Sequence, residues 1–371
     1  MSYEITRYDP LYKDQICELE KEIWSPDPDV NKSYLQWKYF DNPHSDTPKI
    51  YLAVSEGRVI AVRGMYESNW QLGDEVFTAP CAGDTVIHPD YRNNAVYSDL
   101  TNFLKNDLYE RGHRYLFSFS AGPATLLHSL AIGWKSIGRI GMMSKEPHPR
   151  TALGKLTSDH KIKKLLKNTI AAGFLRRAVN KFGRGNALNY RKNKHTHIRI
   201  EENPIPDEMA ALAAKLVKDN KLVLARDEKF FKWRYANPLS KYVFLYWYDK
   251  ELKGYLTAQT PLYRNDSMRK FNITELEGAN STIKMDLLKS AVSLLDTRSI
   301  SIWSNMLNED CRRYLASNGF IESKSTGSAA EYTPTVLVTM TKGPSSEIEH
   351  HGTNLLDINN WDLKMIYSDA F

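Results

Sequence analysis

The segment from Asp84 to Leu100, DTVIHPDYRNNAVYSDL, combines polar side chains with the pattern of a strand, a turn and a helix. Free main-chain N–H groups at the start of such a helix, together with its dipole, favour a negatively charged ligand. Arg92 can add a bidentate contact, while Asn93, Asn94 and Ala95 are compact enough to let an anion approach the backbone. A pyrophosphate group fits this description.

The strand before this turn carries two candidate bases. Asp84, Val86 and His88 alternate onto one face of it, and either polar residue could take a proton from a nucleophile. A structural histidine before proline, and a carboxylate at the solvent end of the strand, are the alternatives.

A motif occurs twice and divides the chain into halves. WKYFDNP spans 37–43 and WRYANP spans 233–238, and each precedes strand-like runs, with turns expected at 56–57, 73–74 and 249–250. A helix, a strand, a second helix and a Gly-aromatic pair follow in both halves; the pairs are Gly133-Trp134 and Gly319-Phe320. We predict that one αβ unit was duplicated.

The predicted fold is α/β (α+β), with two tandem domains that each contain a mixed, mostly antiparallel sheet flanked by helices. The first domain is expected at 1–148 and the second at 199–342. A basic helical linker, 149–198, joins them, and a tail, 343–371, follows. The patterns do not indicate which domain the tail contacts.

Composition narrows the function classes. The 371 residues carry a net charge of +6, yet 150–194 alone holds thirteen Lys and Arg against one acid, Asp159, so the basicity is local. This stretch fits a solvated amphipathic linker better than a nucleic-acid site. Three distant cysteines suggest neither a disulfide framework nor a metal site. Without an apolar run of about 18 residues or a signal peptide, a cytoplasmic protein is expected.

The strand–turn–helix resembles the acyl-CoA site of the GNAT (Gcn5-related N-acetyltransferase) superfamily, whose pattern is Arg/Gln-x-x-Gly-x-Gly/Ala. Here Ala95 replaces the first glycine and Tyr97 the second. The resemblance implies acyl-CoA as co-substrate and no metal. It assigns coenzyme binding to Ile87, Arg92, Asn93, Asn94, Ala95, Val96 and Tyr97.

The stretch SFSAGPATLLHSLAIGWKSIG resembles the closing unit of the same superfamily. Members often carry a tyrosine four residues before its glycine, as the acid that protonates the leaving thiolate. Ser129 takes that position here, with His128 beside it. Solvent or His128 is then expected to supply the proton, although a lone histidine on such a helix more often packs.

The paired motifs, HPDYR, FSFSAGP and the ending NNWDLKMIYSDAF together resemble tandem-GNAT sugar N-acyltransferases. These acylate nucleotide-linked amino sugars for surface polysaccharides such as O-antigen, and one type transfers 3-hydroxybutanoyl to dTDP-3-amino-3,6-dideoxy-D-galactose. The resemblance implies acceptor-binding roles for Trp37, Tyr39, Trp233, Tyr235 and Asp369. Packing of the four aromatics, and an exposed tail carboxylate, are the alternatives.

Two other functions stay open. An aminoacyl-tRNA-dependent transferase of the cell-wall kind also has duplicated GNAT folds, and it would use 150–194 to grip RNA. A ligand-binding protein with a decayed coenzyme site is the non-catalytic alternative. The sequence leaves the oligomeric state open, a homodimer included.

Overall fold

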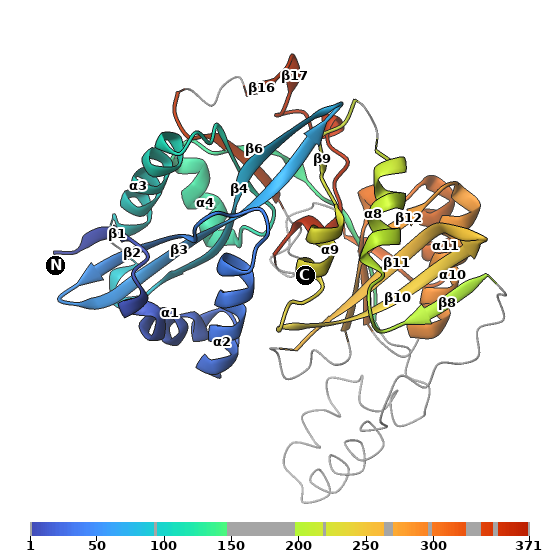
Figure 1. Ribbon diagram of the computed structural model, residues 1–371, viewed down its shortest axis with the longest axis horizontal. Coiled ribbons are helices and arrows are strands. Elements are labelled where there is room, and N and C mark those ends of the chain that lie inside the picture. The colour runs from blue at the N-terminus through green and yellow to red at the C-terminus, as the bar shows by residue number, and fades with distance from the viewer. Residues whose placement is uncertain are drawn as a thin grey trace, which may run out of the picture.

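A computed structural model describes residues 2–92, 95–146, 197–217, 220–262, 270–295, 299–323, 335–343 and 348–369. Two β-sheets lie side by side, one mainly from each half of the chain, and helices flank them (Figure 1). The predicted α/β (α+β) class is therefore confirmed. The basic stretch 150–194 lies outside the described residues. Across the described ranges, none of the helices is long and apolar enough to cross a membrane.

The first sheet contains, in spatial order, β1 (Glu4–Arg7), β2 (Lys49–Ser55), β3 (Arg58–Leu72), β4 (Glu75–Ile87), β5 (Tyr115–Ser118), β15 (Thr335–Met340) and β6 (Lys135–Arg139), with β9 (Val223–Leu224) paired to β3. Neighbours are antiparallel except β4 and β5. Glu56, Gly57 and Gly73 have positive φ in the turns that join β2, β3 and β4. The predicted antiparallel meander is confirmed.

Helices cover both faces of this sheet because side chains alternate along its strands. The helices are α1 (Lys13–Leu19), α2 (Pro28–Leu35), α3 (Val96–Glu110) and α4 (Pro123–Ala131). Ile50, Leu52 and Val54 of β2 share a buried cluster with α1 and α2, whereas Tyr51 and Ala53 share another with α3.

The second sheet contains, in spatial order, β14 (Ile321–Ser323), β7 (Met142–Lys145), β13 (Ser299–Trp303), β12 (Lys270–Gly278), β11 (Glu251–Pro261), β10 (Ser240–Asp249) and β8 (Ile198–Glu201). Its helices are α8 (Pro206–Lys215), α9 (Glu228–Arg234), α10 (Ser281–Leu295) and α11 (Glu309–Ser317). The cluster around Phe244 includes residues of α8 and α9, and that around Leu245 includes residues of α10 and α11. The second half thus repeats the first.

The two halves exchange strands. β7 falls within the range predicted for the first domain, 1–148, yet it pairs with β13 and β14 of the second sheet. Conversely β15, within 199–342, inserts between β5 and β6 of the first sheet. The short strand β9, also within 199–342, pairs with β3 of the first sheet. Among the described strands, pairing therefore crosses the predicted domain boundaries at three places. The local pattern of a strand does not specify its partner when the partner is distant in the chain.

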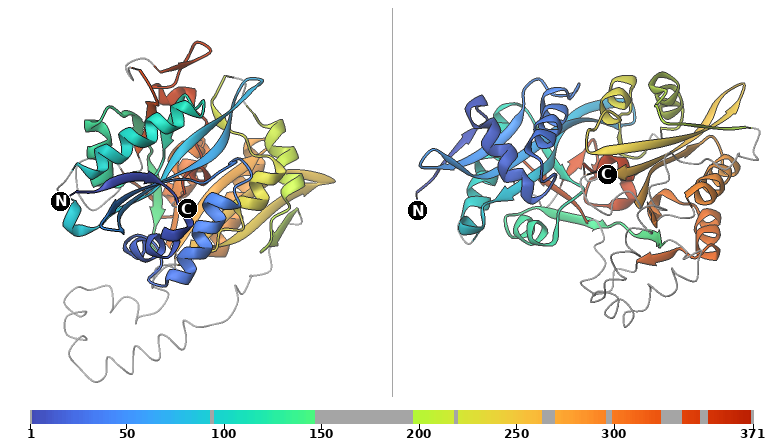
Figure 2. Two further views of the ribbon diagram at one scale, coloured as in Figure 1. Left: turned by 60° about the vertical axis from the view of Figure 1, so that its left-hand side comes forward. Right: turned by 90° about the horizontal axis from the view of Figure 1, so that it is seen from below.

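The C-terminal segment 348–369 packs against both halves (Figures 1 and 2). It begins with the small hairpin of β16 (Glu349–His350) and β17 (Thr353–Asn354). The Tyr66 hydroxyl donates to the carbonyl of Tyr367 at 2.8 Å, and the Arg234 guanidinium donates to that of Ser368 at 2.8 Å. This segment brings Asp369 into the interior, where the carboxylate is buried.

The tryptophans of the repeated motif meet at the centre of the molecule. Trp37 and Trp233 stack with ring centroids 5.1 Å apart and planes 13° apart. Each indole donates to the main-chain carbonyl of the other, Trp37 Nε1 at 2.6 Å and Trp233 Nε1 at 2.7 Å. This reciprocal contact joins equivalent residues of the repeats, so it marks the local two-fold relation between the halves.

We expect Trp37→Phe to lower the free energy of unfolding by about 1–3 kcal/mol, because it removes the buried hydrogen bond from the indole to the Trp233 carbonyl and reduces the stacked aromatic surface. Chemical denaturation followed by circular dichroism measures the loss. Trp247→Phe is the control, since Trp247 is partly exposed and stacks on His197 far along the second sheet. Equal stability of the Trp37 variant and the wild type would contradict a structural role for the contact.

Candidate active site

A cleft opens where β4 and β5 separate. These parallel strands are paired only at Cys81 and Phe117. Beyond that pair the gap between them becomes a cleft of about 240 Å³ at the α4 end of the first half. Its polar lining residues are Arg63, Asp84, Thr85, Ser118, Ser120, Thr125, Ser129 and Asp369. Three residues predicted for the site, Asp84, Ser129 and Asp369, thus line one cleft.

Asp84 is the most fully bonded group of the cleft. Its Oδ1 accepts from Trp24 Nε1 at 2.8 Å and from Lys38 Nζ at 2.9 Å, and its Oδ2 accepts from the Tyr39 hydroxyl at 2.6 Å. The carboxylate is buried rather than at a solvent-exposed strand end. Three donors fix its orientation, which a group that takes a proton requires.

Lys38 links the two carboxylates of the cleft. Its Nζ lies 2.7 Å from Oδ2 of Asp369, whose other oxygen accepts from the Ser120 hydroxyl at 2.5 Å. Burial alone would lower the pKa of Lys38, but Asp369 and Asp84 raise it above its ordinary value, so the ammonium stays charged. One cation therefore bridges the two carboxylates, and the Arg63 guanidinium on the cleft wall is a second positive charge nearby.

The local backbone lets Lys38 and Tyr39 reach Asp84. After α2 the chain continues as a π-helical turn, Gln36–Phe40, that carries both residues. Opposite them, a Cβ on Gly64 would overlap the Tyr39 hydroxyl, and one on Gly83 would lie 2.7 Å from Lys38 Nζ. These two positions require glycine because the side chains approach the backbone so closely.

Glu20 is a further carboxyl group beside this cluster. It is wholly buried, and neither side-chain oxygen has a hydrogen-bond partner. Burial raises its pKa well above the ordinary value, and the charge of Asp84 raises it further. Both effects favour the neutral form of Glu20, which avoids a third buried negative charge.

Ser129 does not act alone. Its hydroxyl lies 2.6 Å from that of Tyr97 on α3, and both side chains are buried. A tyrosine of α3 therefore contacts a serine that lines the cleft. Tyr97 also stacks under Arg63, whose guanidinium carbon is 4.6 Å from the ring centre. The residue that replaces the second glycine of the family pattern thus supplies a hydroxyl.

Arg63 is buried and carries unused donors. Its side chain is 1% exposed, and Nε and Nη1 have no hydrogen-bond partner. An unpaired buried guanidinium is costly unless a ligand supplies an acceptor, so its place on the cleft wall indicates a ligand with anionic or carbonyl oxygens.

The other predicted site residues lie outside this cleft. His88 lies 3.1 Å from Arg58 and borders a surface hollow beside α1. His128 is exposed, with Nδ1 2.8 Å from the Ala124 carbonyl and its ring 5.4 Å from that of Tyr97, and its role stays a prediction. Arg92 contacts the carbonyl of Ile87 at 3.0 Å and Glu22 at 3.4 Å.

The predicted coenzyme loop is described in part. Ala95, Val96 and Tyr97 form the start of α3, and Asn93 and Asn94 lie outside the described residues. Val96 is fully buried in the core under α3.

The motif aromatics predicted to bind the acceptor are all buried. Tyr39 donates to Asp84 on β4, and Tyr235 donates to Glu275 on β12, so the two tyrosines hold equivalent carboxylates. Together with the stacked tryptophans, this geometry gives them positioning contacts. Their direct contact with an acceptor stays a prediction.

In the second half, the corresponding carboxylates form ion pairs with buried cations. Arg226 Nη1 lies 2.6 Å from Glu275 and 2.7 Å from Glu277, and Lys364 lies 3.1 Å from Glu277. Burial would raise the pKa of Glu277, but Lys364 and Arg226 lower it to about 2. Both carboxylates are therefore paired with cations within the protein.

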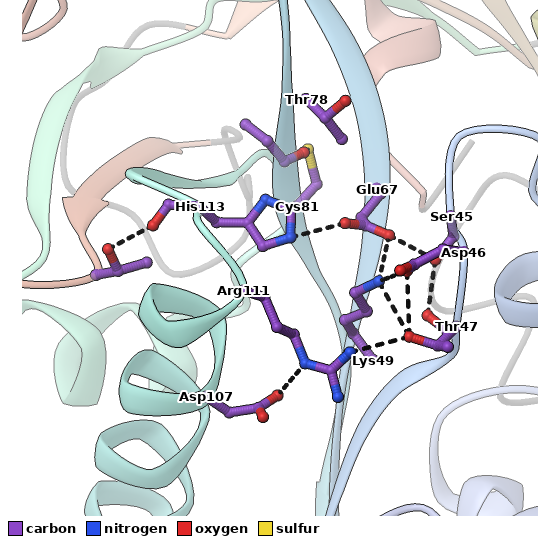
Figure 3. Close-up of polar contacts among 12 residues, drawn as sticks. Ser45, Asp46, Thr47, Lys49, Glu67, Thr78, Cys81, Asp107, Arg111 and His113 are labelled. Carbon is purple, nitrogen blue, oxygen red and sulfur yellow. Dashed lines mark hydrogen bonds and ion pairs between the residues drawn. The ribbon is translucent and has the colours of Figure 1, made fainter.

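The first sheet also contains a separate buried network of polar side chains around Glu67 (Figure 3). Glu67 accepts from Ser45 at 2.5 Å and lies 2.8 Å from Lys49 and 2.9 Å from His113. Its partners lower the pKa of Glu67 despite its burial. The network has its own partners and does not line the cleft, so we assign it to stability.

Lys38, Arg63, Glu20, Trp24 and Ser120 were not among the residues predicted for the site. The repeated motif contains one feature that could have indicated Lys38. The residue before the tyrosine is a cation in both copies, Lys38 in the first and Arg234 in the second. Arg63 and Glu20 sit in ordinary strand and helix patterns, and only their burial distinguishes them.

We expect Glu20→Gln to stabilise the protein at pH 7. With a raised folded pKa, the contribution of Glu20 is fully present below its ordinary value of 4.5 and falls as the pH rises, by about 1.4 kcal/mol per unit up to the folded pKa. Glutamine keeps the shape and does not titrate. Thermal unfolding should show a gain at pH 7 that vanishes towards pH 4.5, with exposed Glu18→Gln unchanged. A variant less stable than the wild type at pH 7 would rule out the buried neutral acid.

No family model matches the sequence, and no curated protein matches it. Solved structures do. A GCN5-related N-acetyltransferase from Anabaena variabilis has a TM-score of 0.56 at 12% identity, covering 92% of this chain and 73% of that one. One from Kribbella flavida has a TM-score of 0.50 at 12% identity, covering 92% and 72%.

A tandem GNAT protein from the clavulanic acid biosynthesis pathway matches over its whole length. Its TM-score is 0.54 at 12% identity, and the match covers 93% of this chain and 100% of that one. At such identities a likeness establishes the fold alone. The chain therefore has the fold of a tandem GNAT protein, with two mixed sheets flanked by helices.

Proposed function

We propose that this protein is an acyl-CoA-dependent N-acyltransferase whose active site is the cleft between β4 and β5. One observation carries the proposal: where these strands separate, Asp84 is held by three donors on the wall of the cleft. Solved proteins of this fold that carry the name N-acetyltransferase support transfer of an acyl group to an amine.

The residues present suit an acyl-CoA. Beyond Cys81, no strand among the described residues pairs with the edge of β4 that faces the gap, so its main-chain groups are available to an amide-rich chain such as pantetheine. Arg63 offers two unpaired buried donors to a ligand oxygen. Arg92 and the start of α3, residues 95–97, would hold the pyrophosphate. The thioester supplies the activated acyl group.

Asp84 serves in this proposal as the base. The amine nitrogen attacks the thioester carbonyl carbon, the carbon–sulfur bond breaks, and the proton lost by the nitrogen passes to Asp84 directly or through water. The thiolate then takes a proton from the Ser129 hydroxyl, which lines the cleft and lies 2.6 Å from the Tyr97 hydroxyl that can replace the proton. His88, which lies outside the cleft, has no part in this scheme.

We propose a nucleotide-linked amino sugar as the acceptor, specifically a dTDP-linked 3-amino-3,6-dideoxyhexose that receives a short acyl group such as 3-hydroxybutanoyl. The sequence resemblance supports the sugar. The cleft supports an amine in general, because the carboxylates of Asp84 and Asp369 line it and can accept hydrogen bonds from an amine. Buried Asp369, at the end of the C-terminal segment, would orient that amine.

A thiol-release assay with a panel of acyl-CoAs, each combined with dTDP-amino sugars or with aminoacyl-tRNA, tests the proposal. We expect release with an acyl-CoA and an amino sugar. Binding of acyl-CoA without release across the panel would instead support a non-catalytic protein, and turnover with aminoacyl-tRNA alone a cell-wall transferase.

With the substrates that this panel identifies, Asp84→Asn should lower turnover by roughly 100- to 10,000-fold, because the amide cannot take the proton. Acyl-CoA affinity, measured by calorimetry, should hardly change. Asp249→Asn, at an exposed turn of the second sheet, is the matched control. Wild-type turnover in the Asp84→Asn variant, or an equal loss of turnover in the His88→Asn variant, would contradict the role of Asp84 as the base.

A further inference from the structure

A second cluster of chemically capable side chains lies away from the cleft. Glu75, at the start of β4, meets His350 and His351 of the β16–β17 hairpin. Their ligand-type atoms all lie within 4.8 Å of one another. His351 has a φ of 48° in the hairpin turn, which places its ring beside the same carboxylate as its neighbour.

The hydrogen bonds around His350 fix which nitrogen carries the proton. The Tyr115 hydroxyl donates its one hydrogen to the carbonyl of Glu349 at 2.6 Å. The Tyr115 oxygen is then an acceptor, so His350 Nδ1, 3.3 Å away, must be the donor to it. In the neutral ring, Nε2 is left with a lone pair.

Among the described residues, no hydrogen-bond donor contacts this lone pair of Nε2. His350 is 7% exposed, and its Nε2 is buried without a hydrogen-bond partner, 3.2 Å from Oε2 of Glu75. A lone pair that faces a carboxylate is repelled unless a cation lies between them.

We propose that Glu75, His350 and His351 bind a divalent transition-metal ion of the zinc class. Two imidazole nitrogens and one carboxylate oxygen form the donor set that such ions prefer, whereas magnesium and calcium prefer oxygen alone. Tetrahedral bonds of about 2.0–2.2 Å place ligand atoms roughly 3.3 Å apart. Nε2 of His350 and Oε2 of Glu75 already have that spacing, and exposed His351, 2.5 Å from the same oxygen, can swing outwards.

The surroundings support a built site. The Nδ1 contact to Tyr115 is the outer-sphere bond that orients a ligating histidine, and the Phe77 ring packs 4.2 Å from His350. The Glu75 and His351 side chains are 44% and 70% exposed, so a solvent-facing fourth position remains. A bound ion would tie the first sheet to the C-terminal segment that carries Asp369.

The test uses the full chain after chelator treatment, titrated with Zn²⁺ by calorimetry and with Co²⁺ by visible absorption. We expect one Zn²⁺ per chain, a Co²⁺ spectrum with tetrahedral or five-coordinate intensity, and a rise in Tm with Zn²⁺ that Mg²⁺ does not reproduce. His351→Ala and Glu75→Gln change exposed side chains and should each weaken binding at least tenfold and abolish the rise in Tm.

His197→Ala is the matched control, because His197 is an exposed histidine on the second half. It should bind Zn²⁺ as the wild type does. The absence of stoichiometric binding, or binding that both His351→Ala and Glu75→Gln leave unchanged, would overturn the site. Each readout is independent of acyl transfer, so the result stands apart from the proposed function.

Discussion

The burial of the Asp84 carboxylate is the constraint on which the rest of the first half depends. A buried charge is stable only when it is paired and hydrogen-bonded, and here Trp24, Lys38 and Tyr39 supply three donors. The π-helical turn positions two of them, and glycines at the facing strand positions leave them room. The C-terminal segment then adds Asp369 as a second partner of the lysine.

The duplication explains why both halves contain the same arrangement of a tyrosine and a carboxylate, which the first half presents to a cleft. Both halves place a motif tyrosine against a carboxylate of the fourth strand, and both motifs carry a cation next to that tyrosine. In the second half Arg226 pairs with the equivalent carboxylate, and Arg234 binds the C-terminal segment instead. The same architecture thus presents a carboxylate to a cleft in the first half. In the second half its cations pair with a carboxylate and bind the C-terminal segment.

Much of this fold could be predicted from the sequence because its signals are local. The turns at 56–57, 73–74 and 249–250, and the helices α3 and α10, follow from residue patterns that act over a few positions. The exchange of β7 and β15 and the burial of the C-terminal segment depend on pairing across hundreds of residues. For the same reason Asp84 could be predicted from strand alternation, whereas Glu20 and Arg63 became visible only through their burial.

The most direct test of the account is a crystal structure of the chain with a non-hydrolysable acyl-CoA analogue. The account predicts that the acyl carbonyl carbon lies in the cleft between β4 and β5, beside Asp84 and opposite the Tyr97–Ser129 pair, with the pyrophosphate at the start of α3. An analogue bound in the second half, or side chains of the first half filling the gap between the strands, would contradict it.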